Sequence, residues 1–266
     1  MYEFNYQKAT SVADAASKLS AGTDTRLLAG GQTLIAAMKL RLAAPTDIID
    51  ISGITELRGI KAGNGGLVVG AMSTHAEVAS SKDVKTRIPA LAVLANSIGD
   101  PMVRNMGTIG GSIANNDPAA DYPAALIGLG ATVKTNQREI TADDFFIGMF
   151  MTSLEPGEII ESVTFPTPKR AAYMKFSNPA SRYAIVGVFV AETDNGVRVA
   201  VTGAGASVFR VPEMEKALTA KFSADAVAGI SVASDDLNAD IHASADYRAH
   251  LITVMAKRAV ETAVAG

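Results

Sequence analysis

The chain has 266 residues, of which 48% are hydrophobic and 19% charged, and its formal net charge is -3 at pH 7. This length can bury a sizeable core and predicts two domains, while the near-balance of charge offers no basic surface for a nucleic acid. The absence of cysteine excludes disulfides, thiolate-held metals and iron–sulfur ligation within these residues, and the three histidines show no metal-binding spacing.

The N-terminal segment predicts a strand, a loop, a helix and a second strand in close succession. The expected elements are a helix at 12–19 after the N-cap Ser11, a strand at 26–29, a helix at 33–42 ended by Pro45, and a buried strand at 47–51. The sequence AGGQT at 29–33 therefore lies at a helix N-terminus. Unpaired N–H groups and the helix dipole favour an anion there.

The middle of the chain predicts strands and helices in alternation. We expect strands at 57–62 and 67–72 joined by a turn at 63–66, a mostly helical stretch at 74–96 interrupted near Pro89, a helix at 121–129, and strands at 132–135 and 159–165. The sequence PTP at 166–168 marks a domain boundary.

After this boundary the pattern changes to strands followed by helices. Strands are expected at 173–176, 185–192 and 197–202, with a hairpin turn at 194–196, and helices at 211–229 and 247–265. The second domain is thus predicted to be a small sheet backed by helices.

Nothing in the sequence predicts a membrane or secreted location. The longest apolar runs, such as 184–191, are too short to span a bilayer. The first ten residues lack a basic start followed by an apolar stretch. We therefore expect a cytoplasmic protein.

Two glycine-centred segments carry the chemistry. AGGQT at 29–33 and TIGGS at 108–112, within the longer stretch 104–121, both couple paired glycines to a hydroxyl residue. Such segments can lay backbone N–H groups against a phosphate, because glycine reaches φ > 0 and lets a ligand come close. Together they predict a dinucleotide whose pyrophosphate is held from both sides. The alternative is that the glycines serve turn geometry alone, and neither segment matches a Rossmann or Walker A motif.

Nearby polar residues have structural as well as functional interpretations. Asp121 can cap the following helix or hydrogen-bond a sugar or ribityl hydroxyl. Asp117 is expected in a turn, Arg104 as a structural hydrogen-bond donor, and His75 at a helix start rather than as a base. GAGAS at 203–207 is read as a plain turn rather than a third phosphate loop. No catalytic constellation appears, which favours a chain that carries electrons on a bound cofactor.

Three segments resemble a known family, namely 29–39, 104–121 and 241–251. They are similar to the FAD-binding medium subunit of molybdenum hydroxylases, above all of the aerobic carbon monoxide dehydrogenase type, and to the matching domain of xanthine dehydrogenase. The resemblance covers essentially the whole chain. Its departures are Gln32, where the family usually has His, and Tyr122, where Leu is common.

The resemblance implies FAD as the cofactor and assigns its contacts. The first glycine segment would hold the pyrophosphate, Lys175 would lie near the flavin, and Tyr183 would cover the isoalloxazine. The implied FAD-binding residues are Leu27, Leu28, Ala29, Gly30, Gly31, Gln32, Thr33, Leu34, Ile98, Thr108, Ile109, Gly110, Gly111, Ser112, Asp121, Ile160, Lys175 and Tyr183.

The resemblance also implies the fold and the partners. The fold would be α+β, with an FAD-binding domain of the p-cresol methylhydroxylase/vanillyl-alcohol oxidase type at 1–168, in subdomains of about 1–55 and 56–168, and a C-terminal domain at 169–266. A large subunit would hold the molybdenum cofactor and a small subunit the [2Fe–2S] clusters, in a dimer of heterotrimers. Electrons would pass from molybdenum through the clusters to FAD, and on to a quinone, NAD or oxygen.

Other functions are compatible with the residues alone. One is a free-standing flavin oxidase of the same broad fold. Another is the FAD subunit of a xanthine, aldehyde or nicotinate dehydrogenase. A third is a non-enzymatic nucleotide-binding module.

Overall fold

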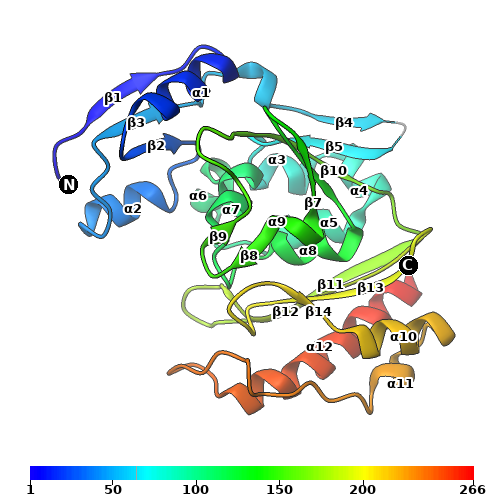
Figure 1. Cartoon of the computed structure of the whole chain (residues 1–266). Helices are drawn as coiled ribbons and strands as arrows, with labels where there is room; N and C mark the ends of the chain where they lie inside the picture. Colours follow the sequence, from blue (N-terminus) through cyan, green and yellow to red (C-terminus); the bar gives the residue numbers. More distant parts are fainter. Residues whose placement is uncertain (64) are drawn as a thin grey trace.

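The computed structural model describes residues 1–63 and 65–266. Its N-terminal unit is a three-stranded parallel sheet in the order β1 (Asn5–Lys8), β3 (Asp47–Asp50), β2 (Thr25–Leu28), with helices α1 (Val12–Ala21) and α2 (Leu34–Lys39). Ser11 caps α1 by accepting the N–H of Asp14, as expected for a serine before an apolar helix face. This unit forms the upper left of the molecule in Figure 1, and its small core around Ile49 and Leu57 also includes Met72 and Ile159 from the central part of the chain.

The central unit is a five-stranded antiparallel sheet covered by helices. Its strand order is β4 (Ile60–Gly63), β5 (Gly66–Gly70), β10 (Ile160–Phe165), β6 (Thr132–Thr135), β7 (Glu139–Thr141). The helices are α3 (His75–Ser80), α4 (Lys82–Arg87), α5 (Pro89–Asn96), α6 (Pro101–Met106), α7 (Ile109–Asn115), α8 (Tyr122–Leu129) and α9 (Ala142–Phe145), followed by a hairpin of β8 (Phe146–Gly148) and β9 (Met151–Thr152). Every residue of α8 is buried, because sheets and helices surround it.

The C-terminal unit is a four-stranded antiparallel sheet with helices beneath it (Figure 1). The strands are β11 (Arg170–Ser177), β12 (Ala184–Thr193), β13 (Gly196–Thr202) and β14 (Phe209–Arg210), and the helices are α10 (Pro212–Ala220), α11 (Ala224–Val227) and α12 (Ala245–Ala265). Strand β12 is buried on both faces, with Phe189 packed in the central core and Val188 against the C-terminal helices. This double burial explains its unbroken apolar run.

The expected α+β fold is confirmed, and most elements lie where the sequence predicts them. The helical stretch at 74–96 is three helices, since Ser81 starts a new helix by accepting the N–H of Val84, and Ile88 leaves the helical conformation before Pro89. The helix predicted at 211–229 is broken at Lys221, whose backbone is extended.

Two other predictions differ in detail. Leu57 belongs to a 3₁₀ turn at Thr55–Leu57, so the strand predicted at 57–62 begins only at Ile60. The hairpin turn predicted at 63–66 joins β4 to β5, but its Asn64 lies outside the described residues. Among the helices that the structure describes, none is long and apolar enough to cross a membrane.

Candidate cofactor-binding site

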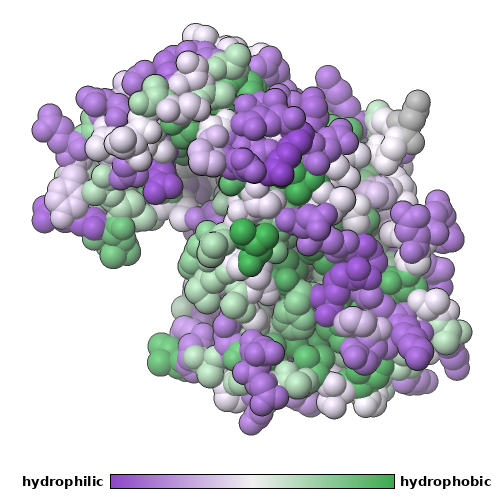
Figure 2. Space-filling model, in the orientation of Figure 1, coloured by the Kyte–Doolittle hydropathy of each residue, from purple (hydrophilic) through white to green (hydrophobic). Residues whose placement is uncertain are grey.

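A large cavity lies between the N-terminal unit and the rest of the chain. Its volume is about 1250 Å³, which exceeds the roughly 300–1,000 Å³ of ordinary small-molecule pockets and suits an extended ligand. Figure 2 shows the molecule indented where these two parts meet. The walls come from segments far apart in the sequence, from Arg26 to Tyr183.

Nearly all of the predicted site residues are brought together here. The residues that line the cavity are Leu27, Leu28, Ala29, Gly30, Gly31, Gln32, Thr33, Leu34, Ile98, Thr108, Gly110, Gly111, Ser112, Asp121, Ile160 and Tyr183. Two predicted residues are not in the wall. Ile109 is fully buried in the central core, and Lys175 lies behind the wall, in contact with Asp121.

The first glycine segment presents free backbone donors. Among the described residues, none accepts a hydrogen bond from the N–H groups of residues 30–34, although these residues line the cavity. Gly31 has φ +71°, and a Cβ on Gly30 would lie 2.0 Å from the carbonyl oxygen of Met106. Glycine is therefore required at both positions by geometry. The resulting row of N–H groups is suited to the oxygens of a pyrophosphate.

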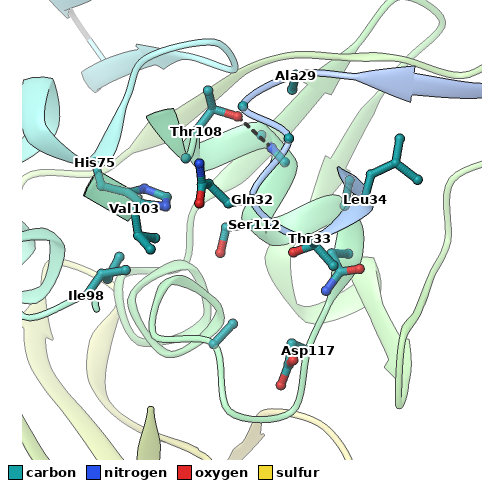
Figure 3. A pocket seen from close by; sticks show the side chains of 18 of the residues that line it. Ala29, Gln32, Thr33, Leu34, His75, Ile98, Val103, Thr108, Ser112 and Asp117 are labelled. Carbon is teal, nitrogen blue, oxygen red and sulfur yellow. Dashed lines mark hydrogen bonds between the residues drawn. The ribbon is translucent and has the colours of Figure 1, made fainter. Parts of the chain in front are cut away.

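The second glycine segment is different from the expected loop. Ile109–Asn115 form the helix α7, with Thr108 as its N-cap. Its first N–H groups already have acceptors: Ile109 bonds Ser73 O, Gly110 bonds Ala71 O, and Gly111 bonds the Thr108 hydroxyl. The expectation of a second row of free N–H groups is thus wrong. The Ser112 side chain points into the cavity in Figure 3 and is the polar group that this segment offers.

Asp121 is the centre of a buried polar cluster rather than a helix cap. It precedes α8, but its side chain makes no capping hydrogen bond. The carboxylate accepts a hydrogen bond from the Tyr173 hydroxyl and forms an ion pair with the Lys175 ammonium at 3.0 Å. Lys175 also donates to Ser97 O at 2.9 Å. Burial raises the pKa of Asp121, and the charge of Lys175 opposes this rise.

Sequence reasoning missed Tyr173. It lies two residues before Lys175 on β11, so both side chains are on the same face of the strand. Strand alternation was the available signal, because a Lys and a Tyr on one face of an otherwise apolar strand need a buried polar partner.

Residues 2–168 match a family described as the FAD binding domain in molybdopterin dehydrogenase. This chain belongs to that family.

Full-length relatives extend the match to nearly the whole chain. The carbon monoxide dehydrogenase medium chain of Hydrogenophaga pseudoflava is 36% identical, over 98% of this chain and 96% of the relative. The nicotine 6-hydroxylase medium subunit of Paenarthrobacter nicotinovorans is 34% identical, over 96% and 95%. A solved structure of reconstituted CO dehydrogenase from Oligotropha carboxidovorans superposes with a TM-score of 0.92 at 32% identity, covering 99% of this chain and 98% of the other.

The cavity of this family member fits FAD on its own chemistry. The free N–H groups of residues 30–34 match the pyrophosphate, and Arg26, Arg104 and Arg182 add positive charge to the cavity wall. Neither departure from the family pattern obstructs it. Gln32 keeps its backbone N–H free, and Tyr122 is fully buried outside the cavity wall.

Arg104 and His75 also line the cavity. Arg104 donates to the carbonyl oxygens of Ile98 and Gly99, as expected for a structural donor. His75 is the first residue of α3, which confirms its helix-start position, and its ring lies at the cavity in Figure 3. Burial and the nearby Arg104 charge lower the pKa of His75 to about 4, so the ring is neutral at pH 7.

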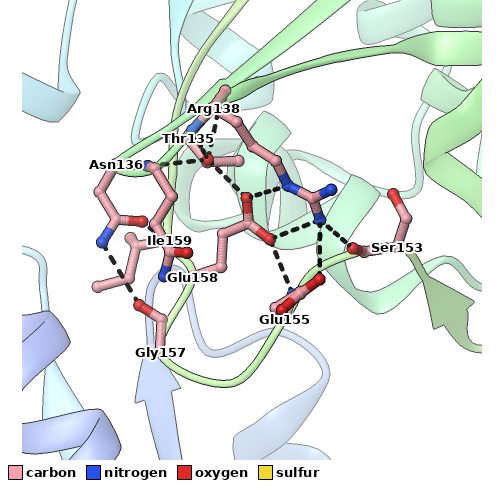
Figure 4. A network of polar contacts seen from close by, with 9 residues as sticks. Thr135, Asn136, Arg138, Ser153, Glu155, Gly157, Glu158 and Ile159 are labelled. Carbon is pink, nitrogen blue, oxygen red and sulfur yellow. Dashed lines mark hydrogen bonds and ion pairs between the residues drawn. The ribbon is translucent and has the colours of Figure 1, made fainter.

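A polar network fixes the wall segment around Glu158 (Figure 4). Arg138 donates to both carboxylate oxygens, at 3.0 and 3.1 Å, and Thr135 donates at 2.7 Å. Chiefly through the hydrogen bond from Arg138, these contacts lower the pKa of Glu158 to about 2. The neighbouring Ile159 is held by its N–H bond to Asn136 at 2.8 Å. The network therefore positions Ile160, which lines the cavity.

We predict that the two glycines of α7 have separable roles. A Cβ on Gly110 would lie 2.7 Å from Ala71 Cβ, whereas a Cβ on Gly111 meets the Thr108 hydroxyl at 3.0 Å and no other group closer than 3.8 Å. Gly110→Ala should lower the free energy of unfolding by about 1–3 kcal/mol. Gly111→Ala should fold and show altered FAD affinity. Urea unfolding and FAD titration test this, and equal unfolding energies for the two variants would contradict it.

We predict that Tyr173→Phe weakens both the fold and FAD binding. It removes a hydrogen bond to a buried carboxylate, at a cost of about 1–3 kcal/mol. Tyr6→Phe is the matched control, because Tyr6 donates to Asp50 at 2.5 Å outside the cavity wall. FAD affinity should fall in the first variant and not in the control. Equal FAD affinity for the two variants would remove Tyr173 from the site.

We predict acid destabilisation between pH 6.5 and 4 caused by His75. Its pKa is lower in the folded chain than in the unfolded chain, so the unfolded state binds more protons in this window. The free energy of unfolding therefore decreases as the pH is lowered from 6.5 to 4. The shift from 6.5 to about 4 corresponds to about 3 kcal/mol. His75→Gln should remove this part of the pH dependence of urea unfolding, while the exposed control His250→Gln should keep it. An unchanged slope in His75→Gln would refute the assignment.

Proposed function

We propose that this chain is the FAD-binding subunit through which electrons leave a molybdenum hydroxylase for an external acceptor. The observation that carries the proposal is the cavity lined by free N–H groups of residues 30–34 in a chain whose residues 2–168 match the FAD-binding family. The lack of cysteine requires that iron–sulfur clusters reside on another chain.

The proposed contacts divide by the chemistry of the cofactor. Residues 29–34 hold the pyrophosphate, with Ser112 across the cavity as a hydroxyl donor. Asp121 hydrogen-bonds the ribityl or sugar hydroxyls from its fixed position. Ile98, Ile160 and Tyr183 offer apolar and aromatic surface to the ring system. The remaining proposed contacts are Leu27, Leu28, Thr108, Ile109, Gly110, Gly111 and Lys175.

Bound FAD supplies an electron carrier that accepts electrons singly and releases them in pairs. The chain's residues orient it and exclude water from part of its surface. Partial burial and the carboxylates of Asp117 and Asp121 raise the pKa of Tyr183, so its hydroxyl stays protonated at neutral pH. Tyr183 thus offers the ring an uncharged aromatic neighbour.

The proposed partners are a large subunit with the molybdenum cofactor and a small subunit with [2Fe–2S] clusters, assembled as a dimer of heterotrimers in the cytoplasm. The relatives' names, medium chain and medium subunit, support a multi-subunit complex. Helix α6 is the surface that we propose contacts a partner subunit beside the cofactor. Its Val103 and Arg104 line the cavity, while its Met102 and Met106 are 78% and 56% exposed and offer apolar surface to the partner. We assign 1–168 to the FAD-binding domain and 169–266 to the C-terminal domain.

We assign the complex to the carbon monoxide dehydrogenase type, which the TM-score of 0.92 with a CO dehydrogenase structure supports. Medium-chain relatives named for carbon monoxide and for nicotine are 36% and 34% identical, which supports a medium chain whose sequence does not set the substrate. A free-standing flavin oxidase is disfavoured, because the match covers 95–96% of relatives that are themselves named as subunits.

We expect the purified chain to bind one FAD non-covalently and to oxidise no substrate by itself. Flavin absorbance after FAD reconstitution, followed by acid precipitation to release the flavin, measures the first property. Anaerobic addition of carbon monoxide should bleach the flavin only when the large and small subunits are present. Absence of flavin after reconstitution, or substrate-dependent bleaching in the lone chain, would refute the proposal.

A further inference from the structure

His75 is a buried polar residue of the cavity wall that lies outside both glycine segments. It is 5% exposed, and Figure 3 shows its ring turned toward the space that Gln32 and Ser112 also face. Its Nδ1 is sealed from solvent and has no hydrogen-bond partner among the described residues. Its Nε2 is likewise unpaired within these residues but is not sealed, so it is the nitrogen open to the cavity. A buried polar group without a partner at the edge of a cavity indicates a hydrogen bond to a ligand.

The backbone fixes this ring beside the first glycine segment. The His75 N–H donates to Gly107 O at 3.0 Å, and Thr74 pairs with Thr108 in an antiparallel bridge. A Cβ on Gly107 would lie 2.6 Å from His75 Nε2, so glycine there leaves room for the ring. A Cβ on Gly30 would lie 2.9 Å from the Cα of the same Gly107. Gly107 therefore lies between His75 and the segment whose N–H groups are free.

Tyr122 favours one of the two neutral forms of the imidazole. The two rings are 5.4 Å apart between centroids, and the Tyr122 hydroxyl is also buried without a partner in the described chain. Burial and the charge of Asp121 raise the pKa of Tyr122, so its hydroxyl keeps its hydrogen. A hydroxyl can donate or accept, but only donation uses that hydrogen, and buried donors are left unpaired less often than acceptors. Nδ1 as the acceptor of this pair leaves the ring hydrogen on Nε2.

The surroundings of Nε2 favour a ligand oxygen. The nearby charge that acts on His75 is that of Arg104, which is positive and also belongs to the cavity wall. The N–H groups of residues 30–34 add further donors in the same wall. A ligand that meets these groups must supply acceptors, and the oxygens of FAD do so.

From this geometry we propose that His75 is a further FAD-binding residue, which donates its Nε2–H to an oxygen of the cofactor beside the first glycine segment. In the same proposal Tyr122 is a positioning residue, because it holds the ring hydrogen on Nε2. The inference rests on the proposed function, since it needs FAD in the cavity.

The first test is FAD titration of the flavin-free full chain at pH 7. His75→Leu removes the donor and should weaken FAD binding about tenfold. His75→Gln is the matched control, because its side-chain amide can still donate to the cavity, and it should stay within about threefold of the original chain. Unchanged affinity in His75→Leu would overturn the proposal, as would equal losses in the two variants.

The second test reads the ring itself by ¹⁵N NMR of the histidine-labelled full chain at pH 7. The chain has three histidines, so comparison with His75→Gln assigns the His75 signals. We expect the hydrogen on Nε2 and a shift of the Nε2 resonance when FAD binds, while Tyr122→Phe should populate the form with the hydrogen on Nδ1. A hydrogen on Nδ1 in the original chain, or an Nε2 resonance that FAD leaves unchanged, would overturn the role of His75.

Two further outcomes separate the hypotheses. An unchanged position of the ring hydrogen in Tyr122→Phe would overturn the role of Tyr122. Flavin absorbance of the same samples tests the proposed function independently. An original chain that retains no FAD contradicts the proposed function, whereas full FAD occupancy with an unaffected His75 contradicts this inference alone.

Discussion

The buried carboxylate of Asp121 needs compensation, and its compensation joins three parts of the chain. A carboxylate without partners would be costly in the interior. Tyr173 and Lys175 reach it from β11, and Lys175 also holds Ser97 O at the end of α5. The C-terminal sheet, the start of α8 and one wall of the cavity are thereby fixed relative to one another. The family match ends at residue 168, yet residues beyond it complete the site.

The two glycine segments contain the same residue types, paired glycines and a hydroxyl residue, but these serve different purposes. In the first, N–H groups of residues 30–34 are free and can act as donors to a ligand. In the second, the N–H groups of Ile109 and Gly110 bond Ser73 O and Ala71 O, which locks α7 onto the connection between β5 and α3. One segment is thus a set of ligand donors and the other a rigid support opposite it. A preorganised site needs both kinds of element.

The elements that follow strong local rules were predictable from the sequence. Ser11 capping α1 and the apolar run of β12 are examples. The sequence predictions were wrong where one local sequence pattern is compatible with two backbone structures. Ser81 can continue a helix or start a new one, and in the folded chain it caps a new helix, which ends at Ile88 before Pro89. Tyr173 was missed because its partner Asp121 lies 52 residues away in the chain.

The sequence by itself determined that no cysteine-held cluster can reside in these residues, and that a glycine segment at a helix start could bind a phosphate. It also carried the family resemblance. Only the tertiary structure decided which glycine segment has free N–H groups, that Asp121 pairs with Lys175, and that the His75 ring lies beside Gly107 in the cavity wall. The physical reason is that local sequence governs backbone conformation, whereas the partners of buried polar groups come from remote segments. Those partners are known only once the chain has folded.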